Sequence, residues 1–523
     1  MQPFDINCML GPTNTDREGS FRTPQSLLAE MDRYGITEAL VYASQARMAH
    51  PEDGNHMLLK TIQGYDRLHA CWVVMPPGTG EQPAPRDLVA QMREQNVRAV
   101  RMFPAEHNFP LVERSLRPLL EALAEAQIPL LIDSGRTGWS QITLDWRSVL
   151  DIAETHPNLP LILLREGGST ARVLFGVWDA FPNLYLGTSY IQESGIVEEI
   201  TERFGHERLL FGSGLPAYDA GGPLSVLKGA QVPQPLRAAI AGNTARRLFG
   251  LPEVESDKAP VWPCGKNGFR VFDIHGHIGR WDRKYYRDWS AEQMVERMDQ
   301  VGIERFAVSD ILAIGPDYRT GNDRIGEAVK VFPDRLIGYV VYNPNYESEM
   351  AAEMARGFDQ LSCRGIKLHC GLHEVSTEAP GYRLAFQTAQ ERACPVLCHV
   401  HQGPSPEFLS ALLANHPDMK FIYAHIGGGN KESLKRFVPV ANEQSNLYFD
   451  LGVSGMPRGT LHWLVKQVPP SQILYGSDHP LNGFTFQLGR VLYADISDEL
   501  KRMILWENAA RIFGSTEWKI RIK

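Results

Sequence analysis

The sequence lacks the features that would place the protein in a membrane or on nucleic acid. No run of about 18 apolar residues occurs, which is what a membrane-spanning helix requires. The first residues lack a basic region followed by an apolar stretch, so we expect no secretory signal. Basic residues are fewer than acidic ones, 53 against 61, and the net charge of −8 argues against nucleic-acid and membrane partners. The seven cysteines are scattered and odd in number, which suits a reducing compartment, and we expect a cytoplasmic protein.

What remains is an ordinary globular composition on an unusually long chain. Hydrophobic residues make up 43% of the sequence and charged residues 22%. A chain of 523 residues exceeds one ordinary domain and fits two barrels of roughly 250 residues each.

An internal repeat divides the chain into two halves. Phe4-Asp5-Ile6 recurs as Phe272-Asp273-Ile274 at an offset of 268 residues, and His156-Pro157 recurs as His416-Pro417 at an offset of 260. Other pairs keep the same order: Asp66-Arg67-Leu68 with Asp334-Arg335-Leu336, Asn183-Leu184-Tyr185 with Asn446-Leu447-Tyr448, Phe211-Gly212-Ser213 with Tyr475-Gly476-Ser477, and Asn243-Thr244-Ala245-Arg246 with Asn508-Ala509-Ala510-Arg511. A repeat of this length is typical of a duplicated domain rather than of a solenoid. We place one domain at residues 1–251, a Pro- and Gly-containing linker at 252–268, and a second domain at 269–516.

Each half alternates short apolar runs with amphipathic stretches. In the second half we expect strands at Val271–Ile274, Arg305–Val308, Leu336–Val341, Gly365–Leu368, Pro395–Val400, Lys420–Ala424, Leu447–Phe449 and Ile473–Tyr475. The clearest helix begins at Ser290, where Gln293 completes a capping box, and it should bury Met294, Met298 and Val301. Eight strand–helix units in about 245 residues favour a (β/α)8 barrel over a doubly wound open sheet. The predicted fold class is therefore α/β, with two tandem TIM-like barrels.

Histidines gather where the strands of the second half end. Functional side chains of such barrels lie at the carboxyl ends of the strands. His275 and His277 are two positions apart on one strand, so both imidazoles face the same side and can bind one cation. Further polar side chains end other strands: Lys367 and His369, His399 and His401, His425, and Asp478. A lone histidine is more often structural, but four strand ends with histidine and a fifth with aspartate indicate a metal site.

The residue types favour one divalent first-row metal, and zinc above others. Neutral imidazoles with one carboxylate suit Zn²⁺, whereas Ca²⁺ and Mg²⁺ prefer shells of oxygen. Catalytic sites leave a coordination position for water, whose pKa the cation lowers to about 7. We expect an activated water that faces a small-molecule substrate above the barrel.

These motifs resemble the amidohydrolase superfamily over residues 270–514. The motifs are Asp-Ile-His-x-His, Pro-Val-Leu-x-His, Ala-His-x-Gly-Gly-Gly and Gly-Ser-Asp-His-Pro, and they occur in the family's order. The branch that they resemble is the amidohydrolase-related one, which includes aminocarboxymuconate-semialdehyde decarboxylase, resorcylate decarboxylases and several lactone hydrolases. The resemblance implies that His275, His277, His399 and Asp478 are metal ligands. It also implies that His425 is a catalytic histidine and that Asp478 accepts a proton from the nucleophilic water.

Other residues near these motifs have two interpretations each. Lys367 lies where some superfamily members carry a carboxylated lysine that bridges two metals, but we favour a cation for a substrate carboxylate. His369 and His401 either bind substrate or have a structural role. Cys394 and Cys398 could join His399 and His401 in a zinc cluster, yet Cys394 precedes Pro395 at the far end of the strand, so packing is favoured. The glycines after His425 lack the Lys-Ser/Thr pair of a phosphate loop.

The first half has lost these side chains. His275 and His277 align with Asn7 and Met9, His399 with Asp133, His425 with Arg165, and Asp478 with Gly214. Lys367 alone keeps its charge, as Arg101. Such a set makes no transition-metal site, so we predict a pseudo-catalytic barrel. The alternative is a metal-free site for an anionic ligand formed by Arg101, Asp133, Arg165 and Glu166.

Three functions compete at this point. We favour a metal-dependent hydrolase of an amide, cyclic amide or lactone, with an anionic substrate. A non-oxidative decarboxylase of an aromatic or unsaturated acid would use similar ligands, and fold does not distinguish the two. A scaffold protein is disfavoured by the intact ligand set. Since members of the family are commonly homodimers, the chain resembles a covalent pseudo-dimer, which leaves higher oligomers open.

Overall fold

The computed structural model describes residues 1–14, 20–133, 135, 144–164, 170–255, 262–265, 268–428 and 431–514. Two compact units make up the chain. One comprises Met1–Val261 with Arg283–Tyr285, and the other comprises Trp262–Asp282 with Tyr286–Lys523. The predicted linker falls partly outside the described residues. In the described part of the chain, no helix is long and apolar enough to cross a membrane.

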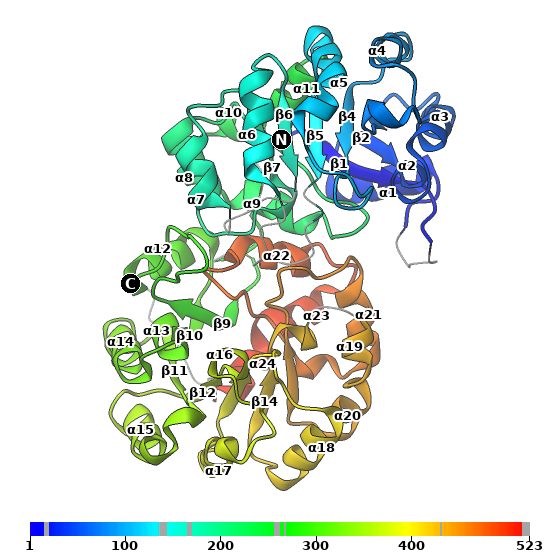
Figure 1. Ribbon diagram of the computed structural model, residues 1–523. Helices are drawn as coiled ribbons and strands as arrows, with labels where there is room; N and C mark the ends of the chain where they lie inside the picture. The colour runs from blue at the N-terminus through cyan, green and yellow to red at the C-terminus, as the bar shows by residue number, and fades with distance from the viewer. Residues whose placement is uncertain are drawn as a thin grey trace. The chain divides into compact units, whose positions relative to one another are not determined.

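The first unit is a barrel of eight parallel strands that pair in chain order. The strands are β1 (Phe4–Leu10), β2 (Glu38–Ala43), β3 (Leu68–Val73), β4 (Ala99–Met102), β5 (Leu130–Asp133), β6 (Leu161–Leu164), β7 (Leu184–Gly187) and β8 (Leu209–Leu210). The helices are α1 (Pro24–Tyr34), α2 (Ser44–Met48), α3 (Pro51–Ile62), α4 (Pro85–Glu94), α5 (Glu113–Ala126), α6 (Trp146–Thr155), α7 (Ala171–Val177), α8 (Ile196–Phe204), α9 (Gly221–Gly229), α10 (Gln234–Ala238) and α11 (Thr244–Leu248). Figure 1 shows these helices around their strands.

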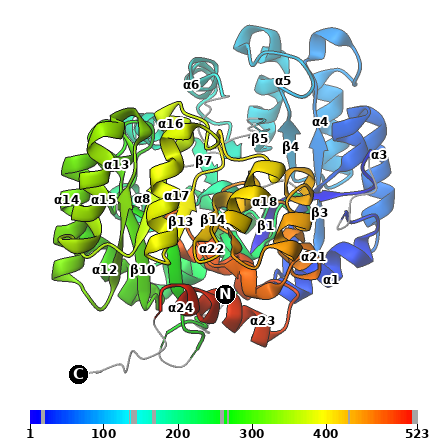
Figure 2. The ribbon, with the colours of Figure 1, turned by 90° about the horizontal axis from the view of Figure 1, so that it is seen from below.

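The second unit repeats this architecture. Its strands are β9 (Phe272–Ile278), β10 (Arg305–Asp310), β11 (Leu336–Val341), β12 (Gly365–Leu368), β13 (Pro395–Cys398), β14 (Lys420–Tyr423), β15 (Leu447–Asp450) and β16 (Ile473–Leu474). Its helices are α12 (Ala291–Val301), α13 (Ile311–Ile314), α14 (Tyr318–Val331), α15 (Glu347–Asp359), α16 (Cys370–His373), α17 (Arg383–Glu391), α18 (Pro406–Asn415), α19 (Lys431–Lys435), α20 (Val438–Glu443), α21 (Thr460–Gln467), α22 (Phe484–Leu492), α23 (Asp498–Arg502) and α24 (Asn508–Ile512). In Figure 2, α14 lies outside β10, as a barrel requires. The predicted fold class of two tandem (β/α)8 barrels is confirmed.

The expected helix at Ser290 forms with its capping box. The Ser290 side chain accepts the Gln293 N–H, the Gln293 side chain accepts the Ser290 N–H, and α12 follows. Met294, Met298 and Val301 are buried, as their helical spacing predicts. They belong to an apolar layer between the strands and the helices. A second apolar layer, which includes Ile274, fills the inside of the barrel.

The repeated motifs close both barrels in the same way. An aspartate in the first strand accepts two backbone N–H groups, one from its own strand and one from a serine after the last strand. The contacts are 2.9 Å each from Asn7 and Ser213 to Asp5, and 3.0 Å each from His275 and Ser477 to Asp273. These bonds join the first and last strands, which explains why the Phe-Asp-Ile and Gly-Ser motifs recur.

A repeated asparagine has a similar structural role. The Nδ2 group of each lies within 3.0–3.4 Å of three backbone carbonyls at the end of a preceding helix: Asn183 contacts Ala153, His156 and Leu159, and Asn446 contacts Leu413, His416 and Met419. Helix ends leave carbonyls without partners, and these side chains satisfy them. Much of the sequence repeat therefore encodes the scaffold rather than the chemistry.

Candidate metal centre of the second barrel

A bulge in β9 directs two histidines into the barrel. Between Asp273 and Gly276, β9 has one residue more than β10 opposite it, because Phe306 pairs with Asp273 while Val308 pairs with Gly276. Bulges of this kind re-aim side chains next to active sites. Gly276 allows the bulge to pack, since a Cβ there would lie 1.8 Å from Cζ of Phe306.

Three of the predicted metal ligands converge. The candidate ligand atoms of His275, His277 and Asp478 all lie within 4.8 Å of one another. Asp478 Oδ1 is 3.5 Å from His275 Nε2 and 3.2 Å from His277 Nε2. The predicted ligand set therefore has three members in one group, which come from β9 and from the loop after β16.

Hydrogen bonds behind these imidazoles orient them. His275 Nδ1 lies 3.0 Å from Oδ2 of Asp450, which ends β15, and His277 Nδ1 lies 3.0 Å from the Ser309 hydroxyl on β10. A carboxylate accepts the proton of His275 Nδ1, so the lone pair of this ring is on Nε2 and faces Asp478. Burial raises the pKa of Asp450, but the contact with His275 outweighs it and holds the pKa at about 2.

The protonation states match those of metal ligands. Burial, and then the charge of Lys367, lowers the pKa of His275 to about 3, and burial also lowers the pKa of His277. Burial alone would raise the pKa of Asp478, yet the hydrogen bond with His277 and nearby histidines lower it. Metal ligands must be deprotonated, and two neutral imidazoles beside an ionised carboxylate meet this requirement. The residues present therefore fit a divalent metal ion.

His425 lies next to this group on the loop after β14. Its Nδ1 donates to the Gly452 carbonyl at 2.5 Å, and its ring centroid is 4.9 Å from that of His275. His425 and Asp478 both have left-handed backbone, with φ of 55° and 64°. Non-glycine residues adopt this conformation at a cost of about 1 kcal/mol or more, and such strain clusters at functional sites.

The other predicted histidines form a stack beside His425. The His399 ring is 4.8 Å from His425 between centroids, and His369 stacks on His399 at 4.0 Å. His399 Nδ1 accepts the backbone N–H of His401 at 3.2 Å. His399 is therefore one imidazole away from the group of three, while His369 is buried and His401 is exposed.

Lys367 is buried in contact with one of the candidate ligands. Its side chain is 0% exposed, and its Nζ is 2.9 Å from His275 Nε2. Burial lowers the pKa of this amine to about 8, although Asp478 and Asp450 act in the opposite direction.

Sequence reasoning missed Asp450 and Ser309. Asp450 follows the predicted strand Leu447–Phe449, and Ser309 follows the predicted strand Arg305–Val308. Neither residue is a histidine, although the carboxyl end of every barrel strand faces the same site. A polar residue directly after each apolar run was the available signal.

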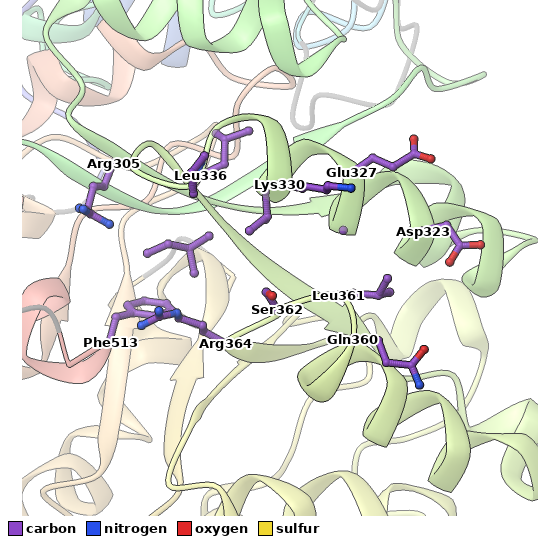
Figure 3. Close-up of a pocket in the computed structure, with 14 residues that line it drawn as sticks. Arg305, Asp323, Glu327, Lys330, Leu336, Gln360, Leu361, Ser362, Arg364 and Phe513 are labelled. Carbon is purple, nitrogen blue, oxygen red and sulfur yellow. The ribbon is translucent and has the colours of Figure 1, made fainter.

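Two other features of the second unit, the cysteines at β13 and a cavity, include none of the predicted site residues. Cys394 precedes β13 and Cys398 ends it, so the two thiols do not form a cluster. A cavity of about 580 Å³ is lined by Arg305 and Leu336, which begin β10 and β11, and by Arg364, which precedes β12 (Figure 3). These are the amino ends of the strands, and none of the predicted site residues lines the cavity.

The first barrel places different side chains at the same positions. Arg101, the third residue of β4 as Lys367 is of β12, is 1% exposed. Its guanidinium donates to Asn7 Oδ1 at 2.8 Å and pairs with Asp133. Arg165 and Glu166 lie outside the described residues, so the proposed anion site of four residues is placed only for Arg101 and Asp133.

Comparison with known proteins identifies the family. A family model described as amidohydrolase matches residues 12–251 and again residues 272–515. A search of curated proteins gave no match.

Solved structures resemble one half of the chain. The 5-carboxyvanillate decarboxylase of Sphingomonas paucimobilis is 15% identical, with a TM-score of 0.38, over 47% of this chain and 99% of that one. A dihydroxybenzoic acid decarboxylase of a Polaromonas species, solved with manganese, is 16% identical, with a TM-score of 0.39, over 48% and 98%. The 4-oxalomesaconate hydratase of Rhodopseudomonas palustris is 16% identical, with a TM-score of 0.36, over 47% and 96%.

Proposed function

The chain belongs to the amidohydrolase family of metal-dependent enzymes, and from this premise we propose that its second barrel hydrolyses an amide, a cyclic amide or a lactone. The observation that supports this most is the group of His275, His277 and Asp478, with Asp450 behind His275. We assign these three as ligands of one divalent metal, with His399 as the predicted fourth ligand, and the donor set favours zinc. When bound, such an ion polarises a carbonyl oxygen and lowers the pKa of a water molecule.

Asp478 is the proposed proton carrier. Its side chain is 13% exposed, more than the imidazoles beside it, and its pKa is lowered mainly through its hydrogen bond with His277. An ionised carboxylate in this place accepts a proton from water and returns it to the leaving group.

We propose that the histidines beside this group orient the substrate. His425 keeps its Nδ1 proton on the Gly452 carbonyl, so Nε2 is the atom that can take a proton as charge develops. His369 Nδ1 accepts the Leu372 N–H at 3.2 Å, which leaves a proton on Nε2 as a donor for a substrate oxygen. Burial holds the pKa of His369 well below its usual value, so this ring is neutral. We propose a small anionic substrate, with His369, His401 and Lys367 as its binding residues.

Isotopic water tests the reaction class. The metal-loaded protein is screened against lactones, amides and aromatic carboxylates, and the active substrate is then turned over in H₂¹⁸O. A hydrolase places one solvent oxygen in the product acid. A decarboxylase instead releases CO₂ and takes up a solvent proton on carbon, without oxygen incorporation. That result would contradict the proposed hydrolase.

A further inference from the structure

Lys367 occupies the lone pair of His275 that faces the candidate metal site. The carboxylate of Asp450 accepts the proton of Nδ1, so Nε2 is an acceptor, and Lys367 Nζ donates to it across 2.9 Å. All three side chains are 0% exposed, so no water competes for these contacts. The amine contact is therefore a defined part of the buried site.

The same lone pair is the one that a metal ion would use. An imidazole nitrogen binds zinc at about 2.0–2.1 Å along its lone pair, and that is the direction from which the amine approaches. One lone pair cannot accept a hydrogen bond and bind a cation at the same time. Ligation by His275 and the contact with Lys367 are therefore alternatives.

The first barrel supports this interpretation independently. Arg101 has the same register, since it pairs with Val73 and Leu131 as Lys367 pairs with Val341 and Leu397. Its guanidinium contacts Asn7 and Asp133, which occupy the positions of His275 and His399. In both barrels the cationic side chain of the fourth strand contacts a position where the second barrel has a candidate metal ligand. In the second barrel its partner is an imidazole, and in the first barrel its partners are an amide and a carboxylate.

We propose that Lys367 competes with the divalent metal for His275 and so sets the metal affinity of the second barrel. The proposal rests on the proposed function, because it takes His275 as a ligand. Metal binding moves the Lys367 amine off His275 Nε2, and the amine is then available to an anionic group of the substrate. Either the metal or the amine is then the cation beside the carboxylates of Asp450 and Asp478.

Metal affinity of the full-length chain tests this directly. The protein is stripped with a chelator and titrated with Zn²⁺ and Mn²⁺ against a chromophoric competitor. Lys367→Met removes the amine and keeps an unbranched side chain, so we expect affinity at least tenfold tighter than that of the unmodified chain. Lys367→Arg keeps a cation and should not tighten binding. Lys330→Met removes an exposed lysine of α14 in the same unit and serves as the matched control, with unchanged affinity.

The outcomes separate this proposal from the proposed function. Equal or weaker affinity in Lys367→Met, with the unmodified chain still binding metal, would overturn the competition; weaker affinity would indicate a lysine that supports the metal. Absence of metal binding in the unmodified chain and in every variant would instead overturn the metal site itself. If thermal melting shows that Lys367→Met does not fold, Lys367→Gln provides the same comparison.

Discussion

The two barrels have the same scaffold but differ in what surrounds the buried cationic side chain of the fourth strand, Lys367 in one and Arg101 in the other. Both close through an aspartate and a serine, both carry the same bulge in the first strand, and both direct a cation from the fourth strand toward the first. In the second barrel that cation meets a histidine, and in the first it meets an amide and a carboxylate. At the positions where the second barrel has the candidate ligands His275 and His399, the first barrel therefore has Asn7 and Asp133, both in contact with the buried Arg101.

Backbone conformation shows the same divergence. Asp478 has φ of 64°, and Gly214 at the equivalent place has φ of 79°. The turn is identical, but glycine adopts it without steric cost, whereas aspartate does not. The second barrel therefore has local strain where it presents a carboxylate, and the first barrel has none at the equivalent residue.

The largest effect should follow loss of the Asp478 charge. Asp478→Asn removes the proposed proton carrier and a ligand, and we expect turnover to fall by about 10²–10⁴-fold or more. Asp133→Ala removes a buried carboxylate of the first barrel and should leave turnover per folded molecule within a few-fold. Steady-state kinetics on both variants measures this, and equal losses would show that the first barrel takes part in catalysis.

The next effect concerns stability of the first barrel. Arg101 and Asp133 are 1% and 0% exposed, and removal of one partner leaves an uncompensated buried charge. We expect Arg101→Met to lower the free energy of unfolding of this barrel by about 3–5 kcal/mol. Denaturant unfolding followed by fluorescence measures the change, while metal affinity of the second barrel should be unaltered. A change below about 0.5 kcal/mol, as at an ordinary surface position, would contradict a stabilising role of the buried pair.

A smaller effect should follow a change behind the metal ligands. Asp450→Asn keeps the shape but not the charge that holds His275 in its tautomer, and such changes typically weaken metal affinity by about 10–100-fold. Ser309→Ala removes an uncharged partner of His277 and should weaken it less. Competition titration with a chelator gives both values, and the reverse order would contradict the arrangement described.

The scaffold could be read from the sequence more completely than the site. The repeat of the two halves and the spacing of the apolar runs predicted the two barrels. The capping box at Ser290 predicted the start of a helix, because it is a local pattern. Three predicted ligands come together because His275 and His277 lie on the first strand of the barrel and Asp478 lies in the loop after the last strand, which closes against the first. Asp450 was missed since no histidine marks its strand, and the contact of Lys367 with His275 joins residues 92 positions apart, which no local pattern encodes.

The smallest effect is expected at the aspartate of the first strand, Asp5, which has its counterpart in Asp273 of the second barrel. Burial raises the pKa of Asp5, so the folded state holds a proton that the unfolded state has released above pH 3.8. The contribution of this group to stability therefore falls as pH rises through the range between the two pKa values. The side chain in Asp5→Asn cannot titrate, so the free energy of unfolding of the first barrel should depend less steeply on pH in this variant. Thermal melts over a range of pH above 3.8 measure it, and an unchanged slope would contradict a raised pKa of Asp5.

Metal content of paired variants tests the central claim that one barrel alone binds metal. Elemental analysis of the purified chain should give close to one equivalent of a divalent metal. The double variant His275→Ala and His277→Ala should lose it, while Asn7→Ala and Met9→Ala, at the equivalent positions of the first barrel, should retain it in full. Two equivalents in the unmodified chain, or metal retained by the histidine double variant, would contradict the account.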